Sequence, residues 1–171
     1  MTMFATLLAT SVALSPPNVA PPYRVAAYLR SGLTVHVAPS QSTGGLGGGA
    51  GVRFSFANRW VAQADCNYLS LVGHVGELRF GGGIQRPGLW SPAALGMVSV
   101  IFGDRFSFRT NDHPWPSKGP IVTGGIMLAP LRFTQNQRTI SVLELGIGIK
   151  PDLPGLGVTY SLGLLEIGHI F

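Results

Sequence analysis

Four histidines and one cysteine are the side chains that most readily bind metals or act in catalysis. His36, His74, His113 and His169 stand apart, without the HExxH or His-x-His spacing that brings two imidazoles to one metal. Cys66 is alone, which excludes an internal disulfide and a cysteine-based zinc site. The sequence therefore predicts no metal site and no cofactor, and His36 is expected to form hydrogen bonds in the interior.

A glycine-rich run at residues 44–49 has the glycine content of a phosphate-binding loop. It lacks the Gly-Lys-Ser/Thr ending and a following helix, whose N-terminus would supply the anion-binding dipole. The run is predicted to belong to a flexible loop at residues 39–47.

The charge content limits the class of protein. Charged residues make up 11% of the 171 residues, against about a quarter in an average soluble domain. The net charge of +5 comes from ten arginines and two lysines that are scattered singly. This spacing is typical of ion pairing and does not suit a nucleic-acid surface, which needs a basic cluster.

The composition favours a β-protein. There are 24 glycines and 13 prolines, and both residues are poor in helix interiors. Mean hydropathy is +0.32, but no run of about 18 uninterrupted apolar residues is present, as a membrane-spanning helix requires.

The chain is predicted to begin with a leader at residues 1–22, followed by one domain at residues 23–171. Residues 3–14 form an apolar stretch of signal-peptide length, followed by Pro16, Pro17, Pro21 and Pro22. The alternative is an apolar N-terminal segment that packs on the fold.

From Tyr23 onward, apolar and polar residues alternate with the period of two that β-strands require. The pattern predicts eight strands joined by short turns and longer loops, with one long fifth strand that continues through Gly103-Asp104. The expected strands cover 23–37, 52–56, 62–68, 77–85, 94–109, 121–133, 143–150 and 156–171, and the main connections are 39–47, 58–59, 72–73, 86–92, 111–119, 134–137 and 151–155.

The fold class that follows is all-β, a closed eight-stranded antiparallel up-and-down barrel that spans a membrane. Alternation alone also fits a soluble barrel with an apolar interior, but the polar face carries too few charges to coat a water-exposed surface. We therefore expect the apolar face to contact lipid and the charged residues to pair in the lumen. The residues expected in this Arg-dominated interior ion network are Arg24, Arg30, Arg53, Asp65, Glu77, Arg79, Arg105, Arg109, Arg132, Arg138, Glu144 and Glu166.

The C-terminus carries a second pattern. Ile167, His169 and Phe171 alternate and end on an aromatic residue, which resembles the signal by which outer-membrane barrels are delivered to their assembly machinery. Leu164-Leu165 shifts the phase, so a bulge or a misplaced side chain is expected there. With the eight-strand plan, the chain resembles the OmpA/OmpX-like small outer-membrane β-barrels. The resemblance implies the bacterial outer membrane as location and, as partners, outer-membrane lipid and the assembly machinery.

The predicted function is a structural or interaction role without enzymatic activity. The barrel would stabilise the envelope, or bind another envelope protein through loops 39–47 and 111–119. One alternative is a lipid A deacylase or acyltransferase of barrel shape, although the sequence has no His-x-Ser pair and its interior is expected to hold Arg and Glu. The pattern also leaves open a narrow anion pore and a soluble ligand-binding barrel.

Overall fold

The computed structural model describes residues 23–171 except 40, 58, 72, 107–118 and 153–154. The predicted leader at residues 1–22 lies outside the described residues, as do residues 111–118 of the second predicted loop. Within the described part, no helix is long and apolar enough to cross a bilayer.

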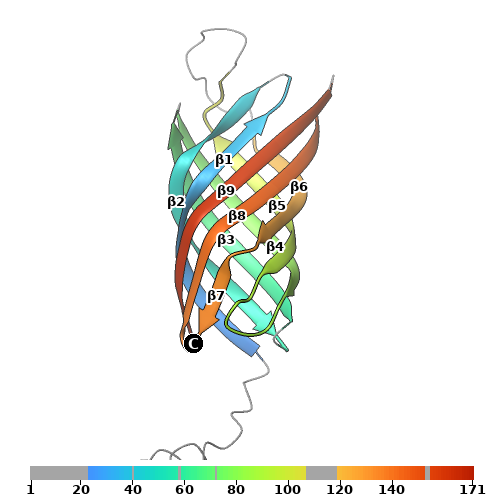
Figure 1. The fold of residues 1–171 in the computed structure, drawn as a ribbon. Coiled ribbons are helices and arrows are strands. Elements are labelled where there is room, and N and C mark those ends of the chain that lie inside the picture. Colours follow the sequence, from blue (N-terminus) through green and yellow to red (C-terminus); the bar gives the residue numbers. More distant parts are fainter. Residues whose placement is uncertain (1–22, 40, 58, 72, 107–118, 153–154) are drawn as a thin grey trace, which may run out of the picture.

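The described residues form one closed antiparallel barrel (Figure 1). From β1 to β6, and again from β7 to β9, each strand pairs with the next along the chain, and β1 pairs with β9 to close the cylinder. β6 and β7 both pair with β8, so they are two parts of one interrupted strand. The predicted closed eight-stranded barrel is therefore confirmed. The strands are β1 (Tyr23–Val37), β2 (Ser42–Phe56), β3 (Trp60–Leu71), β4 (His74–Gln85), β5 (Ala93–Gly103), β6 (Ile121–Ala129), β7 (Arg132–Gln135), β8 (Arg138–Asp152) and β9 (Gly155–Ile170).

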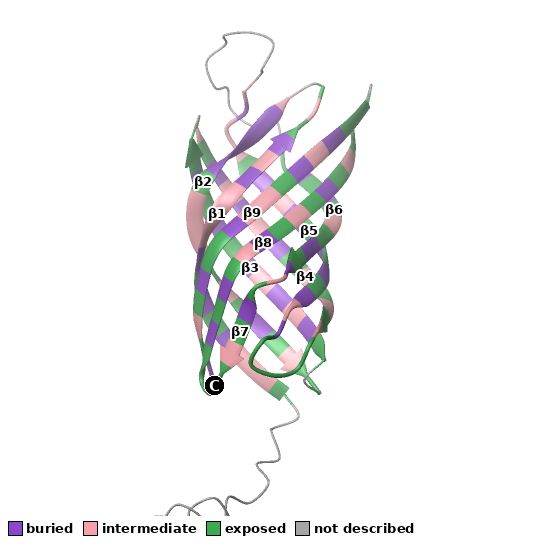
Figure 2. Ribbon diagram, in the orientation of Figure 1, coloured by how far each residue is buried: buried purple, intermediate pink, exposed green. Residues whose placement is uncertain are grey.

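Burial alternates along the strands, as Figure 2 shows. In β1, Leu29 is 69% exposed while the next residue, Arg30, is 8% exposed. The same inversion runs around the barrel: large aliphatic and aromatic side chains cover the outside, and charged side chains are buried inside. An apolar exterior around a polar interior is the arrangement of a membrane barrel and the reverse of a soluble one.

The barrel has two ends that differ in their connections. Tyr23 and Phe171 lie at the end that also carries the turns after β2 and β7, and we call it the terminal end. The opposite end carries the connections after β1, β3, β5 and β8, and we call it the loop end. The terminal end also carries the connection after β4 at residues 86–92, whereas the longest connection, between β5 and β6, is at the loop end. Outer-membrane barrels have their longer loops outside the cell, which indicates that the loop end is the outer one.

The predicted loop at residues 39–47 is wrong, because β2 already begins at Ser42. Gly44 to Gly49 pair with both β1 and β3, except that Gly44 pairs with β1 alone. A Cβ built on Gly47 would lie 2.0 Å from the carbonyl oxygen of Tyr68, so glycine is required by close approach of the neighbouring backbone. Glycine has no side chain to mark one face as apolar or polar. A run of glycines therefore shows no alternation, and the sequence pattern does not indicate this part of the strand.

The predicted long fifth strand is also wrong. β5 ends at Gly103, whose φ of 126° lies in the region that favours glycine. The backbone N–H of Asp104 then donates to the carbonyl oxygen of His74, and Phe106 forms an isolated bridge with Ser42. The chain therefore leaves β5 and crosses toward β2, and Arg109 lies outside the described residues.

Two irregularities set the phase of the last strands. Leu164 is an extra residue at a β-bulge between β9 and β1, which leaves both Leu164 and Leu165 exposed and Glu166 buried. Leu143 has a φ of 77° and no partner in β9. The expected phase shift at Leu164-Leu165 is thus present as a bulge, and β8 contains a second shift that the sequence pattern did not indicate.

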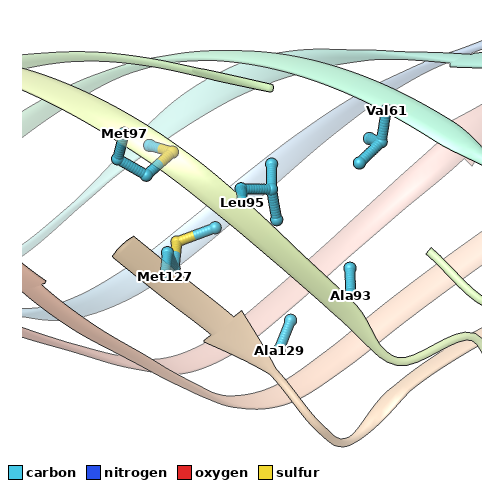
Figure 3. Packing of buried hydrophobic residues seen from close by; sticks show 6 residues of the cluster. All are labelled: Val61, Ala93, Leu95, Met97, Met127 and Ala129. Carbon is cyan, nitrogen blue, oxygen red and sulfur yellow. The ribbon is translucent and has the colours of Figure 1, made fainter. Parts of the chain in front are cut away.

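Not all of the lumen is polar. An apolar cluster from β3, β5 and β6 packs against one side of the interior (Figure 3). The cluster fills space that charged side chains would otherwise have to fill, so the ion network is restricted to the rest of the lumen. Its members are Val61, Ala93, Leu95, Met97, Met127 and Ala129.

Candidate functional site

Arg30 forms the centre of a buried ion network that crosses the lumen. It projects inward from β1, between β3 and β8 on opposite sides of the barrel. One terminal nitrogen of Arg30 lies 3.0 Å from an Asp65 oxygen, and the other lies 3.1 Å from a Glu144 oxygen. The planar guanidinium can serve two carboxylates at once, so this single side chain ties three strands together.

A second part of the network extends toward the loop end. Arg79 of β4 lies 3.2 Å from Asp65 and 3.9 Å from Glu77. Glu77 also accepts hydrogen bonds from Thr34 at 3.2 Å and from Asn67 at 3.0 Å. These neutral donors satisfy one oxygen of the buried carboxylate without adding charge, while among the described residues its Oε1 has no hydrogen-bond partner.

A third part joins β2 to β9. Arg53 donates to Glu166 at 2.6 Å and to Gln63 at 3.0 Å, and its guanidinium lies 4.6 Å from the centroid of the Tyr28 ring. The Tyr28 hydroxyl donates to Asp65. Asp65 therefore contacts donors from all three parts of the network.

The network is balanced in charge. Among the described residues, its ion pairs join four arginines (Arg30, Arg53, Arg79 and Arg132) to four carboxylates (Asp65, Glu77, Glu144 and Glu166). Arg132 completes it by donating to Glu144 at 2.8 Å. The predicted dominance of arginine does not hold for this paired core.

The remaining arginines of the predicted set lie elsewhere. Arg24 is half-buried and lines a cavity at the terminal end. Arg105 is buried near the loop end, where it donates to the carbonyl oxygen of Gly119. Arg138 is exposed on the outer face, contrary to the prediction. Strict alternation would place Arg138 on the same face as Glu144, but the irregular Leu143 between them reverses the facing of the earlier residues.

The predicted ion network named only charged residues and left out its neutral members. Tyr28, Thr34, Gln63 and Asn67 are all buried and bonded to its charged groups. Gln63 and Asn67 share the inward face of β3 with Asp65, so their spacing could have indicated them. Tyr28 lies between Ala27 and Leu29, which both face outward, so the alternation of β1 also indicates its inward position.

His36, His74 and His169 lie in separate places among the described residues, and His113 lies outside them. His36 is buried and lies 2.9 Å from the Thr159 hydroxyl. The His74 ring is hydrogen-bonded to Tyr68, while Asp104 accepts from the His74 backbone N–H and not from the ring. In the part of the chain that the structure describes, no group of three potential metal ligands occurs.

The side chains of the predicted assembly signal lie at the terminal end of β9. Ile167, His169 and Phe171 are all exposed on the outer face, and the rings of His169 and Phe171 meet edge to face at 4.9 Å. Aromatic side chains are also exposed near both ends of the barrel, as in the girdles that mark membrane interfaces. The described ones include Tyr23, Trp60, Trp90, Tyr68 and Tyr160.

The barrel is similar to two solved structures. One is Ail, the attachment invasion locus protein of Yersinia pestis, in complex with the heparin analogue sucrose octasulfate, with a TM-score of 0.51 and 12% identity over 87% of this chain and 99% of that chain. The other is Neisserial surface protein A, with a TM-score of 0.52 and 8% identity over 87% of this chain and 96% of that chain. No protein-family model and no curated protein matches the sequence.

These likenesses define the class of protein. The fold is that of the small bacterial outer-membrane β-barrels, as the resemblance to the OmpA/OmpX-like class implied. The apolar exterior fits insertion of this barrel in a bilayer. The chain is therefore an eight-stranded transmembrane barrel of the outer-membrane type.

Proposed function

We propose that this barrel serves a structural or interaction role in the outer membrane, without enzymatic activity, and that its lumen is plugged. The observation that carries the proposal is the ion network that joins β1, β2, β3, β4, β8 and β9 across the interior. Residues that conduct ions must release them easily, whereas these residues bind one another at hydrogen-bond distances.

The interior gaps support a plug. Beyond the cavity of about 250 Å³ at the terminal end, two further cavities inside the barrel measure about 20 Å³ and 10 Å³; one is lined by Arg79 and Thr159, the other by Arg30 and Glu77. A cavity needs roughly 10–15 Å³ to hold one water molecule, so each accommodates about one. An anion pore would also need a net positive lining, and the paired core has equal numbers of both charges.

Conductance measurements test the plug. We expect the refolded barrel to give no single-channel steps in a planar bilayer, and Arg30→Ala to remain closed or to leak weakly, because Arg79 and Arg132 still hold the two carboxylates. Anion-selective steps in the wild-type protein that disappear in Arg79→Gln would contradict the plug. Arg138→Gln, on the outer face, is the matched control.

An interaction role would use the loop end. The structure of Ail, which has the same fold, holds a heparin analogue, and this supports partner binding by a barrel of this size. In our chain the connection after β1 is only Ala38–Gln41, so a partner would bind mainly the connection between β5 and β6, which includes the predicted loop 111–119. The partner would be another envelope protein.

Cross-linking tests that interaction. A photo-cross-linking amino acid at Ser117 should capture a defined envelope protein in native membranes, and the same group at the Asn136 turn of the terminal end is the matched control. Capture at Asn136 alone, or at neither site, would contradict a loop-end partner.

The lipid-modifying alternative has little support. His74 and Asp104 meet through a backbone N–H, so the carboxylate does not orient the imidazole as a catalytic acid–base pair requires. We expect the mass of lipid A to be the same with and without overexpression of the protein. A loss or gain of an acyl chain would overturn this proposal.

A further inference from the structure

A cavity of about 250 Å³ opens at the terminal end of the lumen. It has the volume of roughly eight water molecules. Four arginines contribute to its lining: Arg24 of β1, Arg53 of β2, Arg132 of β7 and Arg86 of the β4–β5 connection. No carboxylate side chain belongs to the lining, as far as the described residues form it.

The two inner arginines are held in place by the ion network, and Arg132 retains donors that the network does not satisfy. Arg53 donates to Glu166 and Arg132 to Glu144, and both carboxylates lie behind the cavity wall. Arg132 is 1% exposed, and among the described residues its Nε and Nη1 have no hydrogen-bond partner. The hydroxyl of Thr139, also in the lining and buried, is likewise unpartnered within the described part. Buried donors of this kind are costly unless a ligand or water satisfies them.

The outer wall of the cavity is ordered by the β4–β5 connection. The backbone N–H of Ser91 donates to the carbonyl oxygen of Arg132 at 2.8 Å, and that of Thr134 donates to Leu89 at 2.7 Å. Arg86 stacks on Trp90, with its guanidinium carbon 5.1 Å from the ring centroid. Arg86, at the rim of the cavity, is therefore supported by the same β4–β5 connection that forms the outer wall of the cavity.

We propose that this cavity is a binding site for a small oxyanion of the phosphate class. The four guanidinium groups exceed the two carboxylates that pair with them, so the cavity is net positive, and arginine forks match phosphate oxygens better than they match a spherical halide. The hydroxyl group of Thr139 adds a neutral donor. The chain's own leader does not supply the anion, because residues 1–22 contain no Asp or Glu.

Calorimetric titration of the refolded barrel with inorganic phosphate tests the site, with sodium chloride at equal ionic strength as the reference. We expect saturable binding of one phosphate per barrel, weakened about 10- to 100-fold by Arg24→Gln or Arg86→Gln, because each removes a charge-assisted contact. Arg138→Gln removes an equal charge outside the cavity and should bind phosphate like the wild type. Heat-dependent migration on a gel verifies that every variant is folded.

The anion could be free phosphate or the phosphate of a lipid headgroup. Titration with glycerol 3-phosphate distinguishes these sources: binding tighter than that of phosphate indicates a headgroup, and weaker binding indicates the free ion. The proposal is overturned if neither compound binds more tightly than chloride, or if Arg138→Gln weakens binding as much as Arg24→Gln does.

Discussion

The buried pair between Arg53 and Glu166 allows a quantitative test of the ion network. Its atoms lie 2.6 Å apart and both side chains are at most 4% exposed. Replacing one partner leaves the other charge buried and uncompensated, which costs about 3–5 kcal/mol. We therefore expect Arg53→Met and Glu166→Met each to lower the free energy of unfolding by about that amount.

The double variant should be much less damaged than the sum of the two. With both charges removed, two apolar side chains of similar length face each other, and such replacements are often nearly neutral. Gln63 and Tyr28 both keep Asp65 as a partner. We expect the double variant to lie within about 2 kcal/mol of the wild type, so the coupling energy is at least about 4 kcal/mol.

The assay is reversible urea unfolding in lipid vesicles, followed by tryptophan fluorescence. Arg138→Met, on the outer face near the terminal end, is the control and should change stability by no more than about 1 kcal/mol. Strictly additive costs, or single costs below about 1 kcal/mol, would refute the view that this pair is buried and mutually dependent.

Other parts of the barrel allow three further predictions. Gly47→Val should prevent folding or cost at least about 3 kcal/mol, while Gly124→Val, with no atom within 4 Å of its built Cβ, should fold; equal unfolding midpoints in urea would contradict the close-approach argument. Phe171→Ala should reduce the yield of folded protein in the outer membrane severalfold, measured by heat-dependent gel migration, and an unchanged yield would remove the proposed assembly signal. N-terminal sequencing of the protein from membranes should begin beyond Met1, and a sequence starting at Met1 would count against an exported leader.

Regular alternation was sufficient to predict most of the fold. In β1, β3 and β4 every second residue is apolar over much of the strand, so strand positions and facing followed directly from the sequence. The scarcity of charge then determined which face contacts lipid. Arg30, Asp65 and Glu144 were accordingly expected in the lumen, where the structure also has them.

The errors arose where the backbone departs from a simple strand. The glycines of β2 show no apolar–polar alternation. Gly103 ends β5 although the alternation of apolar and polar residues continues beyond it. The Leu143 irregularity reversed the facing of Arg138, and Pro130, which has no N–H to donate, lies at the break between β6 and β7. These features depend on contacts between distant strands, and a single-strand pattern does not contain them.

The partners within the network were beyond sequence reasoning for a similar reason. Which carboxylate meets which arginine depends on strand register and on the width of the lumen. Arg30 and Glu144 are far apart in the sequence and meet because β1 and β8 both flank β9. The terminal-end cavity likewise required the β4–β5 connection to fold against β7.

The orientation of the side chains relative to the bilayer is tested most directly by spin labels on four consecutive residues of β5. In a Cys66→Ala background, labels at Gly96 and Val98 should collide often with oxygen dissolved in the lipid, while labels at Met97 and Ser99 should be shielded. We predict that this alternation has a period of two. The proposed orientation would be contradicted if labels at Met97 and Ser99 collided often with oxygen while a water-soluble relaxation reagent reached labels at Gly96 and Val98.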